Sequence, residues 1–586
     1  MLDRRRFLVF IGAAAAAAAL PAAAGYPVRY VRPKREGNYG AGDGSSYENA
    51  WNGFSAMSDR EWSALNVTGV SSTLWVCGTH AECIDFASYQ GEFGGAGFTA
   101  AGRQDGLVIR GDYSGDPGVI DTRANDYTFM NRQLGPHPVY DRWLAGLNSN
   151  AGALCASVNF RTACNITLKS LTIYAGASPL NCTQANNPAA KRMDLYYPPG
   201  DLTPCGGQPY NGIPIYYPQN IAIFSNNGSR NIRITGCTVV GNGKNSRAPI
   251  GLQGGGGKPS IITIDGNDIS GFLKGINMSF GQHNRDLAVS IRNNRIHDLG
   301  FADGDHDFVD GIVCYADFNN RNQSCEIVGN DVSGFYQDGI DLFYGGGVLV
   351  RDNYIHDAKL TRIAYMSDPH WNADESNGDQ NGIKFGGDGS FGSNRIIGNV
   401  VVNMLTAGIS SNNTGNHAII ANNLVVNTDP DFGGDGISIF GTQSVQNVVA
   451  NNTVVGYKRG IRCESESNSF FNNICKSVPK NSTYINGARP QADILFSGGA
   501  AAKGNRTFTN LLANNLFIKQ SGAASHDTGN ISGDPRFRNE VRKDFRLKPG
   551  SPCVGGGTYP GFDLTDENGV PLKQPYSIGA YRGQVT

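Results

Sequence analysis

A short pattern recurs along this chain: a run of alternating apolar residues, an asparagine, and a second run of the same kind. It reads "ITIDGNDIS" around Asn267 and "VLVRDNYIH" around Asn353. The asparagines at this position are Asn267, Asn294, Asn330, Asn353, Asn399, Asn423, Asn452 and Asn473, and Cys237 fills the same position once. Apolar alternation of this length is typical of short β-strands. Its repetition indicates stacked units and not a set of unrelated domains.

A second pattern, x-Gly-Ile-x-apolar, interleaves with the first. Its glycines are at positions 275, 311, 339, 382, 408, 436 and 460, so successive copies lie between 24 (460 − 436) and 43 (382 − 339) residues apart. No helical pattern separates the strands, so neighbouring units must pair in parallel. We therefore predict an all-β, right-handed parallel β-helix, a solenoid with an asparagine ladder and capped ends. Asparagines scattered among the turns of a β-sandwich would not share one apolar pattern.

The chain begins with an arginine cluster, an alanine-rich apolar run and small residues that are typical of an export signal, which we place at residues 1–24. The run "RRRFL" within it resembles a twin-arginine signal, and an ordinary secretory signal is the alternative. We expect export to the periplasm or the cell exterior. Beyond the signal we expect an N-terminal cap with the first strands over residues 25–105, the β-helix core over 106–480, and the last coils with a C-terminal cap over 481–586.

Charge and cysteine content limit the partners. The 49 basic and 50 acidic residues give a net charge of −1, which does not indicate nucleic acid or a charged membrane surface as a partner, and we expect a monomer with no membrane contact after signal removal. Twelve cysteines in an exported chain indicate disulfides, although their connectivity is open. Close pairs that could bridge loops are Cys77 and Cys83, Cys155 and Cys164, Cys182 and Cys205, Cys314 and Cys325, and Cys463 and Cys475.

The outward positions of the second pattern form two columns of side chains, one before the glycine and one after the isoleucine. Asp310, Asp338 and Asp341 occupy these columns in two adjacent coils, and Lys384 follows one coil later, roughly 5 Å further on. Three carboxylates this close repel one another unless a cation neutralises them, and hard oxygen ligands suit Ca²⁺. A nearby metal ion would in turn disfavour the ammonium form of Lys384 and make it a base. For any one of these residues, a solvated polar face is the simpler interpretation.

Two stretches, "YQDGIDLF" and "NGIKFGGDG", with "VDGIV" one coil earlier, together resemble the family 9 polysaccharide lyases, the β-helical pectate lyases and their relatives. The resemblance covers residues 310–389. It implies β-elimination from a uronate-containing, pectate-like polysaccharide, with Asp310, Asp338 and Asp341 as calcium ligands and Lys384 as the general base.

One position departs from the family pattern, since Gln337 stands where these lyases have an aspartate. Calcium then binds more weakly, uses the Gln337 carbonyl, or takes ligands from "DGDHD" (residues 303–307). Insertions over residues 282–308 and 359–380 would form walls beside the same face. We expect Asn381 to contact substrate, together with Arg362, His370 and Trp371 from the second insertion.

Three alternatives stay open. The motif Y-x-x-D-P-H at residues 365–370 is similar to that of mannuronan C5-epimerases, which also begin by removing the C5 proton. A non-catalytic adhesin or carbohydrate-binding β-helix would explain the fold and the export, although not the aspartates in register beside a lysine. A hydrolase would need paired carboxylates as acid and base, and Lys384 would then have no role.

Overall fold

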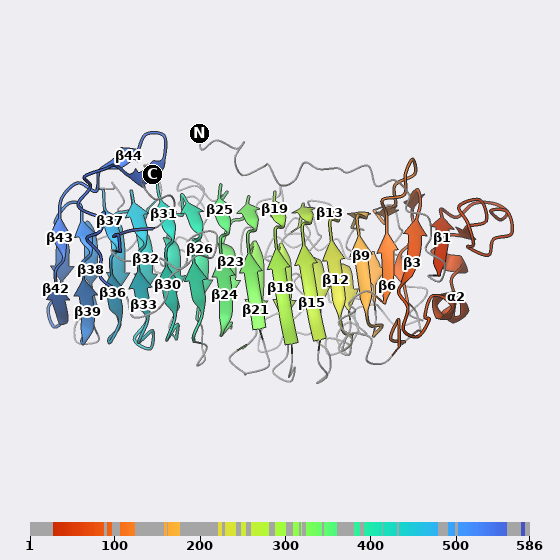
Figure 1. Cartoon of the computed structure of the whole chain (residues 1–586), viewed down its shortest axis with the longest axis horizontal. Coiled ribbons are helices and arrows are strands. Elements are labelled where there is room, and N and C mark those ends of the chain that lie inside the picture. The colour runs from red at the N-terminus through yellow and green to blue at the C-terminus, as the bar shows by residue number, and fades with distance from the viewer. Residues whose placement is uncertain are drawn as a thin grey trace, which may run out of the picture. The chain divides into compact units, whose positions relative to one another are not determined.

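The computed structural model shows an all-β chain built from successive coils (Figure 1). It describes the following residues: 27–86, 89, 91–95, 106–123, 157–160, 162–175, 221–225, 229–241, 248–252, 260–272, 274–279, 287–300, 309–315, 318, 324–342, 345–359, 380–386, 392–412, 414–429, 433–478, 490–498, 502–559 and 576–580. Residues 1–24, which we assign to an export signal, lie outside these ranges.

The chain divides into two compact units. One comprises Pro27–Leu349 and Asn353–Phe385, and we call it the N-terminal unit; the other includes Val350–Asp352 and Gly386–Thr586, and we call it the C-terminal unit. Strands of three sheets, A, B and C, run through each unit, and neighbours in these sheets pair in parallel. Parallel pairing of short strands, coil on coil, confirms the predicted parallel β-helix. The boundaries that we expect at residues 105 and 480 stay predictions.

In the N-terminal unit the strands of each sheet follow one another coil by coil. Sheet A has the order β2 (Trp51–Asn52), β1 (Val28–Arg32), β3 (Ser72–Val76), β6 (Leu107–Arg110), β9 (Ile166–Lys169), β12 (Ile232–Thr235), β15 (Ser260–Asp265), β18 (Leu287–Arg292) and β21 (Ser324–Val328). Sheet B has the order β4 (Thr79–His80), β7 (Val119–Asp121), β10 (Thr172–Tyr174), β13 (Thr238–Val240), β16 (Asp268–Ser270), β19 (Arg295–His297), β22 (Asp331–Ser333) and β25 (Tyr354–His356). Sheet C has the order β5 (Ile84–Asp85), β8 (Val158–Asn159), β11 (Ile221–Ser225), β14 (Ala248–Leu252), β17 (Ile276–Ser279), β20 (Ile312–Tyr315), β23 (Asp338–Leu342) and β26 (Asn381–Phe385).

Two helical segments lie near the start of this unit, η1 (Phe54–Ala56) and α2 (Asp59–Ala64). A capping box at Ser58 and Glu61 starts α2. Strand β24 (Val348–Arg351) contains residues of both units.

The C-terminal unit has the same three-sheet construction. Its sheet A contains β27 (Arg395–Ile397), β30 (Ile419–Ala421), β33 (Val448–Ala450), β36 (Ser469–Phe471), β39 (Asn505–Phe508) and β42 (Ser525–Thr528). Its sheet B contains β28 (Val400–Val402), β31 (Leu424–Val426), β34 (Thr453–Val455), β37 (Ile474–Lys476), β40 (Leu511–Leu512) and β43 (Ile531–Ser532). Its sheet C contains β29 (Ala407–Ser411), β32 (Asp435–Ile439), β35 (Arg459–Cys463), β38 (Ala492–Phe496) and β41 (Phe517–Lys519).

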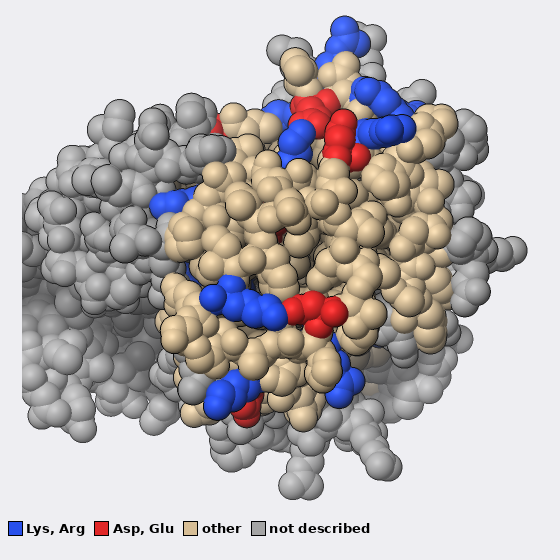
Figure 2. Space-filling view, turned by 90° about the vertical axis from the view of Figure 1, so that its left-hand side faces the viewer, with Lys and Arg blue, Asp and Glu red and all other residues tan. Residues whose placement is uncertain are grey.

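A β-hairpin follows these coils, formed by the antiparallel pair β44 (Phe537–Asn539) and β45 (Asp544–Leu547). Phe537 packs with Val455, Ile474 and Leu511 of sheet B in a hydrophobic cluster. Figure 2 faces the end of this unit where β42 and β43 lie; its described surface is largely uncharged, and some of the basic groups there adjoin acidic ones.

The predicted asparagine ladder is present in both units. Asn267 donates from its backbone N and from Nδ2 to Asn294 Oδ1, at 3.0 and 2.9 Å, and Asn294 repeats both bonds to Asn330. The N-terminal unit continues this ladder to Asn353, and the C-terminal unit has one of its own through Asn399, Asn423, Asn452, Asn473, Asn510 and Asn530. Each asparagine bonds to a backbone group at a bend, and all of them except the partly buried Asn530 lie in the interior.

The glycine of the second pattern is required by close approach of neighbouring coils. A Cβ on Gly339 would lie 2.7 Å from the carbonyl oxygen of Gly382 in the next coil, which is closer than real Cβ contacts allow. The isoleucine after each glycine, such as Ile340 or Ile383, is fully buried. This local packing fixes the direction of the residues on either side of the Gly-Ile pair.

Seven cysteines of the pairs suggested above are thiols in this structure: Cys77, Cys83, Cys164, Cys314, Cys325, Cys463 and Cys475. The sulfur atoms of Cys314 and Cys325 lie 3.7 Å apart in the interior. Cys155, Cys182 and Cys205 lie outside the described residues. None of the helices formed by the described residues has the length and apolar character that a membrane crossing requires.

Candidate functional site

The strand register of sheet C produces the two outward columns that the sequence predicts. In the column after the isoleucine, Val313 pairs with Asp341, and Asp341 pairs with Lys384. In the column before the glycine, Asp338 pairs with Asn381. Residues that are far apart in sequence therefore become nearest neighbours on one face of the N-terminal unit.

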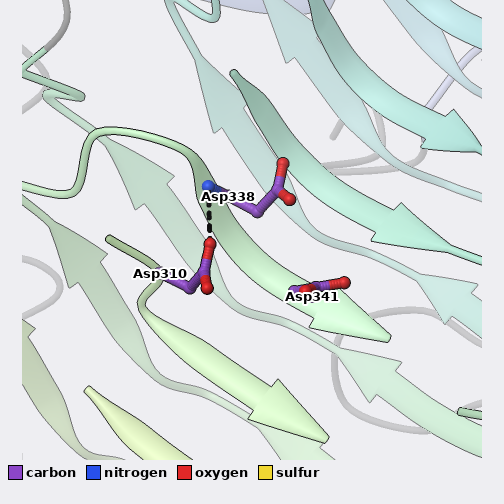
Figure 3. Close-up of side chains that lie close together, drawn as sticks. All are labelled: Asp310, Asp338 and Asp341. Atoms are coloured by element: carbon purple, nitrogen blue, oxygen red, sulfur yellow. Dashed lines mark hydrogen bonds between the residues drawn. The ribbon is translucent and has the colours of Figure 1, made fainter. Parts of the chain in front are cut away.

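Three carboxylates meet on this face, from the coils of β20 and β23 (Figure 3). Asp310 and Asp338 are 1 % exposed and Asp341 is 5 % exposed. One oxygen from each lies within 4.8 Å of the others. Carboxylates buried this close together repel one another when ionised, and nearby cations reduce that repulsion.

Backbone and side-chain amides hold two of these carboxylates in place. The backbone N of Asp338 donates to Asp310 Oδ1 at 3.2 Å, the bond drawn in Figure 3. Asp338 Oδ1 accepts from the backbone N of Asn381 at 3.2 Å and from its Nδ2 at 2.8 Å. Asn381 is only 2 % exposed, and it positions Asp338. Its contact with substrate stays a prediction.

Two lysines lie against the cluster. Lys384 Nζ is 3.6 Å from Asp338 Oδ2, with its side chain 9 % exposed. Lys274 Nζ is 2.7 Å from Asp310 Oδ2, with its side chain 7 % exposed. With all five groups ionised, three negative and two positive charges leave a net charge of −1.

The three carboxylates fit a hard divalent cation. A Ca²⁺ ion lies 2.3–2.6 Å from each oxygen ligand, so two ligands on opposite sides of it are about 4.8 Å apart. The separation in the cluster is at or below that value. Asp310, Asp338 and Asp341 would hold the ion, and their oxygen chemistry favours Ca²⁺ over a soft transition metal.

Gln337, which replaces an aspartate of the lyase pattern, directly precedes β23. Its Oε1 is buried and accepts no hydrogen bond from the described residues, whereas its backbone N donates to Val309 O at 3.1 Å. A buried carbonyl oxygen of this kind is suited to a cation. Its role as a ligand stays a prediction.

Several predicted site residues lie outside the described part of the chain. They are Arg362, His370, Trp371 and the acidic run at residues 303–307. Lys274, in contrast, is a residue that we did not assign to the site from the sequence. Its place in the column before the glycine, one coil ahead of Asp310, was the available signal.

The corresponding columns of the C-terminal unit hold an ion-pair network. Arg459 pairs with Asp435, Arg462 Nη1 lies 2.9 Å from Asp435 Oδ2, and Arg462 Nη2 lies 2.7 Å from Glu464 Oε1. Burial alone would raise the pKa of Asp435, but Arg459 and Arg462 hold it below its usual value. Here acids and bases balance one another.

Comparison with known proteins gives distant structural similarity. No family model matches the chain, and no curated protein sequence matches it. A pectate lyase, Pel9A, is similar in structure with 13 % identity, a TM-score of 0.35 and coverage of 95 % of this chain and 96 % of that one. The periplasmic alginate epimerase AlgG has 11 % identity, a TM-score of 0.34 and coverage of 79 % and 77 %. The catalytic unit of an α-1,3-glucanase from Streptomyces thermodiastaticus has 10 % identity, a TM-score of 0.40 and coverage of 88 % and 70 %. The resemblance to family 9 lyases therefore rests on the motif residues.

Proposed function

We propose that this chain is an exported polysaccharide lyase that cleaves a uronate-containing, pectate-like polymer by calcium-assisted β-elimination. One observation carries the proposal: three buried carboxylates on two adjacent coils lie beside a lysine of the next coil. A metal that withdraws electrons and an amine that takes a proton are the two groups that this reaction needs.

Asp310, Asp338 and Asp341 hold the cation on this face, and Asn381 keeps Asp338 in place through its two hydrogen bonds. When bound, Ca²⁺ neutralises the C6 carboxylate of the uronate and acidifies the C5 proton. Lys384 Nζ takes that proton. The electrons of the C5–H bond form the C4=C5 double bond as the C4–O glycosidic bond breaks, and the departing oxygen takes a proton from water.

The lysine separates this proposal from an adhesin and from a hydrolase, but not from an epimerase. An adhesin needs no buried cluster of acids, and a hydrolase would use two carboxylates without a lysine. An epimerase shares the first step, removal of the C5 proton, and differs in returning a proton to the opposite face of the sugar ring.

The test is calcium-dependent formation of unsaturated uronate, followed by ultraviolet absorbance, on polygalacturonate, rhamnogalacturonan, alginate and glycosaminoglycans. We expect product on one of these polymers that disappears with chelator. Lys384→Ala should lower the rate by about 10²- to 10⁴-fold, the usual contribution of a general base. Lys359→Ala is the matched control, because Lys359 is exposed and donates to Leu299 O at 2.9 Å, outside the cluster.

One result would contradict the lyase activity, and another would contradict the assignment of its base. Entry of solvent deuterium at C5 without unsaturated product would identify an epimerase. Unsaturated product that forms at the same rate in Lys384→Ala would leave the lyase activity but refute the assignment of its base.

A further inference from the structure

Lys274 and Lys384 approach the carboxylate cluster from opposite sides. In sheet C of the N-terminal unit the strand order is β17, β20, β23, β26; Lys274 lies just before β17, and Lys384 lies on β26. Lys274 is the closer of the two, at 2.7 Å from Asp310 Oδ2 against 3.6 Å from Lys384 Nζ to Asp338 Oδ2.

The contact between Lys274 and Asp310 is buried on both sides. The two side chains are 7 % and 1 % exposed. Removing one partner of such a pair leaves the other charge in an interior that solvates it poorly. Lys274 therefore places a positive charge against the Asp310 carboxylate within the fold itself, without a metal ion.

A divalent cation that joins this cluster enters a site that already holds positive charge. With about 2.4 Å from calcium to oxygen, the ion would lie no further than about 5 Å from Lys274 Nζ if it used the oxygen that Lys274 contacts. The two cations repel each other, and both use the charge of the same carboxylate.

We propose that Lys274 is a resident counter-cation of the site, which stabilises Asp310 without metal and lowers the affinity for calcium. This inference rests on the proposed metal-assisted function, and it adds a residue that sets how tightly the metal binds. Lys274 is a positioning residue, because it acts through Asp310 and not on the substrate.

The size of the effect follows from Coulomb's law. A single charge about 5 Å from a divalent ion changes the binding constant by at least about tenfold, even with the dielectric constant of water. Lys274→Gln keeps a donor for Asp310 and removes the charge, so we expect calcium to bind at least about tenfold more tightly. Lys274→Arg keeps the charge and should bind calcium within about twofold of the wild type.

The experiment is a calorimetric titration of full-length wild type, Lys274→Gln and Lys274→Arg with calcium chloride. Lys458→Gln is the matched control, because Lys458 is similarly buried, at 8 % exposed, and belongs to the C-terminal unit. Thermal melting with chelator and with calcium gives a second readout. Lys274→Gln should lose stability in chelator and regain it with calcium, because the calcium ion then takes the place of the missing lysine charge beside Asp310.

The outcomes separate this inference from the proposed function. Calcium binding by the wild type that is lost in Asp341→Asn but unchanged in Lys274→Gln would overturn the role of Lys274 alone. A Lys274→Gln protein that stays unfolded in calcium would also overturn it. No calcium binding by the wild type or by Lys274→Gln would overturn the metal site and this inference together.

Discussion

The hydrogen bonds of the asparagine ladder allow the stability loss from removing one asparagine to be predicted. Asn294 is 1 % exposed, and its side chain takes part in four hydrogen bonds. Its Oδ1 accepts from the backbone N and Nδ2 of Asn267, and its Nδ2 donates to Ile264 O and to Asn330 Oδ1, all at 2.9–3.0 Å. Asn294→Ala removes all four bonds and leaves their partners in the interior.

A buried hydrogen bond contributes about 1 kcal/mol net, so the loss amounts to about 4 kcal/mol of the free energy of unfolding. Water that enters the space left by the amide would lower this figure. The residue before Asn294 adds a second constraint, because Asn293 has a φ of 53°, in the left-handed region. The bend cannot relax into an ordinary strand to recover the bonds.

Cys237 provides the internal control, since it fills the same position of the pattern with a thiol, which donates weakly from Sγ to Thr235 O at 3.6 Å. Its backbone N still donates to Asn267 Oδ1 at 2.9 Å, which Cys237→Ala would preserve. We expect Cys237→Ala to cost about 1 kcal/mol or less. Equilibrium urea unfolding followed by far-ultraviolet circular dichroism compares the two variants. Equal losses in Asn294→Ala and Cys237→Ala would refute the structural role of the ladder.

Two further predictions concern titration and oxidation. His297 Nε2 lies 3.0 Å from Asp268 Oδ1 and His297 Nδ1 lies 2.7 Å from Asp298 Oδ2, and these bonds, that to Asp268 foremost, raise the pKa of His297 and lower those of the two aspartates. The stabilising contribution of the imidazolium is therefore fully present below its unfolded pKa of about 6.5 and is lost as pH rises through the raised pKa, whereas the contribution of the aspartates is lost as pH falls below about 4. Between these limits the free energy of unfolding of the wild type should exceed that of His297→Gln by up to about 1 kcal/mol, and at pH 9 by less. A difference in urea unfolding that does not change with pH would contradict this. Cys314 and Cys325, 3.7 Å apart, should form a disulfide in protein exported to an oxidising compartment, worth about 3 kcal/mol for a loop of this length; a non-reduced digest in which both cysteines are alkylated would show otherwise.

Much of the fold follows from the sequence because each coil repeats the same local signals. Alternating apolar residues, a bend asparagine and a glycine with no room for a Cβ recur in register, so one coil predicts the next. The ladder extends further than the pattern indicated, to Asn510 and Asn530. These two were missed because the strands that follow them, β40 and β43, have only two residues each, which is too short for an apolar alternation.

The sequence predicts those parts of the candidate site in which the period of the strand alone decides the face to which a side chain points. It does not predict contacts that depend on the conformation of a long or branched side chain. The period of two in a strand places Asp341 and Lys384 in one column, and the register bears this out. The bond from Lys274 to Asp310 joins residues 36 positions apart, and nothing in the stretch "LKGIN" indicates which acid Lys274 contacts. Likewise Asn381 belongs to the predicted column, but its two bonds to Asp338 depend on how the amide turns.

Stacking makes the distance along the sequence irrelevant to the chemistry of a column, because an insertion of any length between two coils leaves their strands paired. Charge in a column is then not enough to identify a site, as the two units illustrate. Asp435 and Glu464 of the C-terminal unit are each paired with an arginine, Arg459 or Arg462. The N-terminal cluster has three carboxylates and two lysines within reach. Among the described residues this leaves an excess of one negative charge when all five groups are ionised, and buried carboxylate oxygens of this kind suit a hard cation.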